Sequence, residues 1–197
     1  GIEPVEFQIG TDAVAVVINA SNDFASDITF EELQLIFSDA SSWSDIRPEW
    51  PNQPILRFIP GTDSGTFDTF VEVVYEGDDS TLIGVDATRI DSEDLVTSED
   101  DNQLVRGVGS NEFAVGFFGY GYYLENQDSL TAITVDGVTP SLETVEDGSY
   151  VLGRPLYIYA SEQALEEEPQ IAAFVSYYLQ HVNDVIADVG YFAASDS

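Results

Sequence analysis

Short apolar runs of strand character alternate along this chain with segments whose apolar residues recur at helical spacing. Buried strands are short and rich in β-branched or aromatic side chains, and such runs occur at residues 12–18, 55–59, 113–118, 131–135 and 155–160. Helical spacing is found at residues 29–37, 66–75, 102–108 and from Pro169 onward. Strands and helices in alternation predict an α/β protein with open sheets.

Several helix ends and loops can be placed from local signals. Thr29 and Glu32 form a capping box, which predicts a helix that begins there and ends before Ser41. Ser161 is expected to cap a short helix. The last helix is expected to begin at Pro169 and to have one apolar face, made of Ile171, Phe174, Val175, Tyr178, Leu179 and Val182. The proline-rich stretch 47–54 and the acidic stretch 77–101 are interpreted as loops.

The charge balance excludes some partners. The chain has 5 basic and 37 acidic residues, a net charge of −32, and all of the basic residues are arginines. Such a charge repels the phosphate backbone, so no nucleic acid is expected as a partner. With 44% apolar residues the chain has enough core for a folded protein. Concentrated salt screens self-repulsion, so the acidity favours a protein adapted to strong brine, a halophilic one, over a merely acidic secreted protein.

The lack of certain residue types excludes some chemistry. There is no cysteine and only one histidine, His181, so thiolate and multi-histidine metal sites are excluded, and no cofactor is expected. No apolar run approaches the ~18 residues that a membrane span needs. No signal peptide is visible, and any export signal is expected upstream of Gly1.

One turn has the composition of an anion site. A strand ends at Ile59, a turn rich in Gly, Ser and Thr follows, and a helix is expected from Thr66. Free N–H groups and the positive end of the helix dipole then meet at one point. Ser64 and Thr66 add hydroxyl donors, and Gly65 lets the backbone approach closely. An ordinary helix cap would have the same sequence, so both interpretations stay open.

Asp63 lies in the same turn and would repel a fully ionised anion. A protonated phosphate can donate its proton to this carboxylate, whereas sulfate at neutral pH cannot, which gives a physical route to selectivity. The alternative is that Asp63 is a turn residue that bonds its own backbone.

Residues 60–68, Pro-Gly-Thr-Asp-Ser-Gly-Thr-Phe-Asp, resemble the second anion loop of PstS-type phosphate-binding proteins, the substrate-binding components of phosphate ABC importers. The resemblance covers nearly all 197 residues in the family's order. It extends over residues 12–19, 29–37, 43–50, 98–102, 114–120, 141–148, 154–159 and the closing helix.

The resemblance implies a class II periplasmic-binding-protein fold, with two α/β lobes joined by two crossing strands. It maps residues 19–152 to a complete second lobe, and residues 1–18 and 153–197 to an incomplete first lobe that holds both hinge strands. Family members begin with about a hundred more residues, within the ~50–200 of an ordinary domain, and these carry a first anion loop. An N-terminal segment or a second chain is therefore expected to complete the first lobe.

The arginines of this chain do not replace that missing half. Relatives that draw an arginine from the second loop have it four residues before the serine, where this chain has Pro60. Arg57 lies mid-strand, seven residues before Ser64. The remaining arginines are expected to be solvated or paired: Arg47, Arg89, Arg106 and Arg154.

The resemblance implies capture of inorganic phosphate between two lobes, for delivery to a membrane ABC permease. Ser64, Gly65 and Thr66 are the expected ligands, with Asp63 as proton acceptor. An extracellular or periplasmic location is expected, with any membrane anchor in the part before Gly1. Two alternatives stay open: another oxyanion such as sulfate, molybdate or a phosphonate, and a structural or assembly role. An enzyme is the weakest interpretation, because no base is apparent near Ser64.

Overall fold

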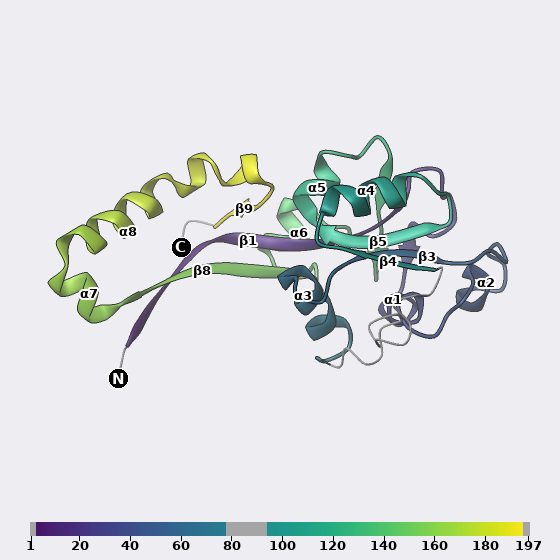
Figure 1. The fold of residues 1–197 in the computed structure, drawn as a ribbon, viewed down its shortest axis with the longest axis horizontal. Coiled ribbons are helices and arrows are strands. Elements are labelled where there is room, and N and C mark those ends of the chain that lie inside the picture. The colour runs from purple at the N-terminus through teal and green to yellow at the C-terminus, as the bar shows by residue number, and fades with distance from the viewer. Residues whose placement is uncertain (1–2, 78–93, 195–197) are drawn as a thin grey trace.

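The computed structural model describes residues 3–77 and 94–194, and its main feature is a mixed sheet in the order β4-β3-β5-β1-β6 (Figure 1). The strands are β1 (Pro4–Asn19), β3 (Leu56–Pro60), β4 (Leu95–Ser98), β5 (Ala114–Gly119) and β6 (Leu130–Ala132). β3 runs parallel to β4 and β5, whereas β1 runs antiparallel to β5 and β6. Parallel neighbours need crossovers, and α3 (Gly65–Val74) and α4 (Asp101–Gly109) lie in these connections.

Strand β1 is shared by the main sheet and by a two-stranded ribbon that it forms with β8. Its residues 14–19 pair with β5 and β6, and residues 4–13 pair antiparallel with β8 (Gly153–Ser161). Exposure alternates along residues 4–9, whereas every residue from Gly10 to Asn19 is buried. Alternation is typical of a strand covered on one face, and continuous burial of a strand covered on both.

The β1–β8 ribbon extends beyond the main sheet as an arm (Figure 1). Helix α7 (Glu162–Glu167) lies at its far end and α8 (Pro169–His181) runs back along it. Two 3₁₀ turns, η2 (Val182–Asp184) and η3 (Ile186–Val189), lead to β9 (Phe192–Ala193), which pairs with β1 at Gly10 and Thr11. We call residues 4–13 and 153–181 the arm, and the rest of the described chain the body.

Smaller elements complete the body. β2 (Asp27–Ile28) and β7 (Thr134–Val135) form a two-stranded parallel sheet. The short helices are α1 (Phe30–Ile36), α2 (Trp43–Ile46), α5 (Tyr120–Leu124) and α6 (Leu142–Glu146). No helix of the described residues is long and apolar enough to cross a membrane.

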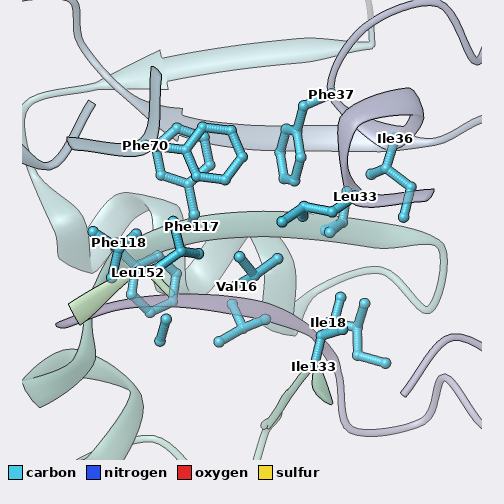
Figure 2. Packing of buried hydrophobic residues seen from close by; sticks show 14 of the residues in the cluster. Val16, Ile18, Leu33, Ile36, Phe37, Phe70, Phe117, Phe118, Ile133 and Leu152 are labelled. Carbon is cyan, nitrogen blue, oxygen red and sulfur yellow. The ribbon is translucent and has the colours of Figure 1, made fainter. Parts of the chain in front are cut away.

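The body has one aromatic-rich core (Figure 2). The rings of Phe70 and Phe117 stack at 3.9 Å, with 6° between their planes, and the ring of Phe37 meets both edge-on. β1 contributes Val16 and Ile18, both fully buried. Because Phe70 lies on α3, the packing of this core fixes the orientation of that helix and hence of its N-terminus.

The structure confirms most of the expected elements. Thr29 caps α1 and forms the capping box with Glu32. β3 and α3 begin within one residue of the expected positions. Pro169 is the first residue of α8. Local propensity suffices for these elements because each carries its own start signal or apolar pattern.

Other expectations were wrong in part. The stretch 77–101 is not all loop, because β4 spans Leu95–Ser98, whereas residues 78–93 lie outside the described chain. The expected strand 131–135 is split into β6 and β7. Ser161 precedes α7, but its side chain makes no capping hydrogen bond. On the expected apolar face of the last helix, Val175 and Val182 are buried and Phe174 is exposed.

Candidate functional site

The turn between β3 and α3 is built as a helix cap. The Ser64 N–H donates to the Gly61 carbonyl at 3.0 Å, which closes the turn. The Ser64 side chain is the N-cap and its Oγ accepts from the Thr66 N–H at 3.2 Å. Serine favours this position because its oxygen satisfies one of the four unpaired N–H groups that begin a helix.

Several hydrogen-bond donors at the start of α3 have no acceptor among the described residues. Within the described part of the chain, neither the Gly65 N–H nor the Thr66 hydroxyl has a hydrogen-bond acceptor. The Ser64 hydroxyl also keeps its proton, since Oγ acts as an acceptor toward Thr66. Helix α3 has 10 residues, so its dipole adds a partial positive charge at the same place.

A cavity of about 450 Å³ opens beside this helix start. It lies between the starts of α3 and α4, the junction of β1 with β8, helix α5, and the end of η3 with the residues that follow it. Its lining residues are Asp12, Thr66, Asp101, Gly119, Gly121, Tyr122, Glu125, Arg154, Asp188, Val189, Gly190 and Tyr191. Chain segments more than a hundred residues apart thus form one site.

A glycine pair forms one wall of the cavity. Gly190 ends η3 in the left-handed region, with φ of +83°. A Cβ on Gly121 would lie 2.7 Å from the Gly190 Cα, so two backbones touch here without side chains between them. Both positions need glycine, the first for close approach and the second also for its φ.

Acidic side chains dominate the cavity, with one arginine opposed to them. Burial, and then the charges of Asp100 and Glu99, raise the pKa of Asp101. The charge of Asp101, and then burial, raise the pKa of Tyr122 above its ordinary value. Arg154 lies directly opposite Asp12 in the strand register and pairs with it at 2.9 Å. An anion entering this cavity would meet carboxylates on most sides, and attraction at α3 and Arg154.

Of the four expected ligands, Thr66 is the one that lines the cavity, and Ser64 and Gly65 precede it in the same turn. Ser64 is half-buried at the cap, Gly65 is exposed, and Thr66 lines the cavity. Asp63 is exposed and is not part of the cavity wall. Their roles as ligands stay predictions.

Arg57 and Arg154 both make hydrogen bonds to backbone carbonyls of the body. Arg57 is 2% exposed, and its guanidinium donates to the carbonyls of Ile36, Ala40 and Ile55. Arg154 is paired as expected, but it also lines the cavity beside Thr66. No local signal marks Arg154, because strand pairing alone brings it to α3.

The single histidine and the Ser64 hydroxyl do not form a nucleophile–base pair in the described chain. His181 is exposed on α8, where its ring stacks on Tyr177 at 4.1 Å, and it does not line the cavity. Among described residues no acid or base bonds the Ser64 hydroxyl. The residues described also hold no cluster of three or more potential metal ligands.

Similarity to known proteins extends over nearly all of the chain. Residues 1–181 match the model of the PBP superfamily domain. The chain is 39% identical to Protein SphX of Synechocystis and 35% identical to the phosphate-binding protein PstS of Staphylococcus saprophyticus. These alignments cover 95% and 98% of this chain but 56% and 58% of the relatives. The chain therefore spans little more than half the length of these curated relatives.

Solved structures agree with that placement. A possible phosphate binding protein from Planctomyces limnophilus superposes with a TM-score of 0.80 at 36% identity, over 98% of this chain and 68% of the other. An ABC-type phosphate transport receptor from Vibrio cholerae superposes with a TM-score of 0.76 over 96% and 72%, and at 19% identity it supports the fold alone.

Proposed function

The chain belongs to the PBP superfamily and is a PstS-type protein, and from that membership we propose that it binds inorganic phosphate at the start of α3. In this proposal two lobes close on the phosphate, which is then released to the membrane permease of an ABC importer. Binding takes place outside the cytoplasmic membrane, in an extracellular or periplasmic space. Capture and release are the whole function, without a chemical step.

The observation that carries the proposal is the start of α3, where unpaired donors stand beside a cavity. Thr66 lines that cavity, and its hydroxyl is free to donate within the described chain. The Gly65 N–H and the Ser64 hydroxyl lie on the same turn. Backbone and hydroxyl donors at the positive end of a helix are the groups that bind oxyanions. We propose Ser64, Gly65 and Thr66 as the ligands.

Asp63 is kept in the proposal as the acceptor of a phosphate proton. It adjoins Ser64 in the chain and its side chain is exposed. Phosphate near neutral pH carries a proton that it can donate to a carboxylate, whereas sulfate repels the same group. Selection of phosphate over sulfate is the property that would follow.

The arm is proposed to be part of a first lobe that these residues do not complete. In this division residues 19–152 form the second lobe, and residues 1–18 and 153–197 supply both hinge strands. Tyr159, Phe174 and Tyr177 support it, because each is more than 60% exposed on the arm. An apolar groove of about 380 Å³ also lies between β8 and α8. Single exposed apolar residues are ordinary, whereas such a gathering favours a covering partner.

We propose that an N-terminal segment or a second chain covers this face. Purification of the protein from its own source, followed by mass measurement, tests this. The expected result is a polypeptide longer than 197 residues, or a second chain that stays bound. A single 197-residue chain that remains monomeric would contradict the proposal.

Replacing Thr66 with valine is expected to weaken phosphate binding about tenfold or more, because a hydrogen bond to a charged group contributes ~1.5–3 kcal/mol. The measurement is titration calorimetry with inorganic phosphate, on the complete polypeptide to which these 197 residues belong. Valine keeps the shape of threonine, so the loss reports the hydroxyl.

Thr62→Val is the matched control, because Thr62 is exposed in the same turn and does not line the cavity. Competition with sulfate and molybdate separates phosphate from other oxyanions. An Asp63→Asn variant that keeps its preference for phosphate over sulfate would remove Asp63 from the proposal. Equal phosphate affinity in the wild type and Thr66→Val would exclude the start of α3 as the site.

A further inference from the structure

Arg154 stands where the arm joins the body. β1 and β8 pair antiparallel with Asp12 opposite Arg154, and the next residues, Ala13 and Gly153, are the last pair of this ladder. Both charged side chains line the same cavity as Thr66. Both β1 and β8 are distant from α3 in the sequence, and their pairing brings the Arg154 guanidinium to the first turn of α3.

The guanidinium contacts that first turn directly. Arg154 Nη1 donates to the Gly65 carbonyl at 2.8 Å and to the hydroxyl oxygen of Thr69. The Thr69 hydroxyl in turn donates to the Gly65 carbonyl at 2.8 Å. A Cβ on Gly65 would lie 3.7 Å from Arg154 Nη1 and 3.8 Å from Nη2. The positive charge is therefore adjacent to the residue whose N–H begins the helix.

One donor of Arg154 is left for a guest. Nε and Nη2 donate to Asp12 Oδ2 at 3.2 and 2.9 Å. With the two bonds of Nη1, this engages four of the five N–H groups that a guanidinium carries. The remaining N–H is on Nη2, and the side chain is 34% exposed. The Asp12 side chain is only 6% exposed. Its buried negative charge therefore neutralises part of the positive charge of Arg154.

The other arginines of the described chain do not line the cavity, and Arg106 is exposed on α4. Arg47 pairs with Glu32 at 2.6 Å, and Arg57 is buried among carbonyl groups. Within the described residues Arg154 is the one basic side chain in the cavity wall, which also holds Asp12, Asp101, Glu125 and Asp188. An anion in such surroundings needs a positive charge, and the partial charge of a helix end is about half a unit.

We propose that Arg154 is a further anion ligand of this site, and that Asp12 sets how much of its positive charge the anion experiences. This inference rests on the proposed binding of phosphate at α3. The ligand class is a small oxyanion, held by neutral donors of α3 on one side and by the guanidinium on the other. In this arrangement Arg154 on β8 selects for negative charge, and the donors at the start of α3 select for the shape of the anion.

Three variants test the role of the charge, each titrated with inorganic phosphate at low and high potassium chloride in the complete polypeptide. Arg154→Gln is expected to raise Kd at least tenfold at low salt, with a smaller factor at high salt because the lost attraction is Coulombic. Arg154→Lys is expected to recover most of the affinity, since it restores the charge. Asp12→Asn is expected to lower Kd severalfold, because it removes the opposing charge and keeps an acceptor oxygen.

The alternative is that Arg154 only holds β8 against α3 and does not contact the anion. In that case loss of the Asp12 charge is expected to weaken phosphate binding, because Arg154 loses the partner that positions it. If Asp12→Asn raises Kd as much as Arg154→Gln does, with both variants folded, the anion-ligand role is wrong. Thr69→Val removes the hydrogen bond between Arg154 and the Thr69 hydroxyl without a change of charge. This variant replaces Asp12→Asn in the test if Asp12→Asn fails to fold. It is expected to leave Kd within about threefold, and a loss equal to that of Arg154→Gln would also overturn the inference.

The outcomes also separate this inference from the function on which it rests. A wild-type protein without saturable phosphate binding would contradict the proposed function itself. A wild-type protein that binds phosphate, together with an Arg154→Gln variant of unchanged Kd, would leave that function standing and overturn only the role of Arg154.

Discussion

Replacement of Arg57 by methionine is expected to lower the free energy of unfolding by about 3 kcal/mol. Arg57 is buried in β3 and donates to the carbonyls of Ile36 at 2.6 Å and Ile55 at 3.0 Å, and also to that of Ala40. Burial lowers its pKa to about 10, so the side chain stays charged at neutral pH. Methionine fills similar space but leaves these carbonyls without their donor. Urea unfolding followed by circular dichroism measures the loss.

Arg47→Met is the matched control for this prediction. Arg47 carries one third of its side chain in solvent, pairs with Glu32 at 2.6 Å and lies over the ring of Trp50. An ion pair of this exposure contributes less than about 1 kcal/mol. Equal losses in the two variants would contradict the view that buried carbonyl satisfaction, and not charge, makes Arg57 important.

Replacement of Phe70 by alanine is expected to cost about 3–5 kcal/mol, the usual loss when a buried phenylalanine leaves a cavity. Phe70 is fully buried, stacks on Phe117 and meets Phe37 edge-on (Figure 2). A domain has only ~5–15 kcal/mol in total, so this variant approaches the limit of folding. Chemical unfolding of this 197-residue chain provides the measurement.

Phe174→Ala is the corresponding control. Phe174 is 65% exposed on α8, so the same substitution is expected to change the stability of this chain by no more than about 0.5 kcal/mol. A Phe70→Ala variant that loses less than about 1 kcal/mol would mean that α3 is not held by this core. Because the start of α3 carries the proposed site, loosening that core is also expected to weaken phosphate binding.

Much of the local structure could be predicted from the sequence. The Thr29–Glu32 capping box locates α1, and Ser64 with the following apolar spacing locates α3. These signals act over three to ten residues, so they mark where a helix begins without reference to distant parts of the chain. β4 was missed because its four residues lie beside a long acidic stretch, and its pairing with β3 is what makes it a strand.

The site was predictable only in part. The hydroxyls and glycine of the α3 turn are local to one another, so the turn chemistry at Ser64, Gly65 and Thr66 could be proposed from residue types. The cavity could not be predicted, because its walls also come from β1, α4, α5, β8 and η3 with the residues that follow it. The close approach of Gly121 and Gly190 likewise depends on how distant segments pack.

The sequence by itself determined that the chain alternates strands and helices, where α1 and α3 begin, and that neutral donors gather at one turn. Only the tertiary structure decided that β1 is shared between body and arm, and that Arg154 faces the same cavity as Thr66. The physical reason is range: a cap or an apolar period is a relation among neighbours. Asp12 and Arg154 are 142 residues apart, and only strand register brings them together.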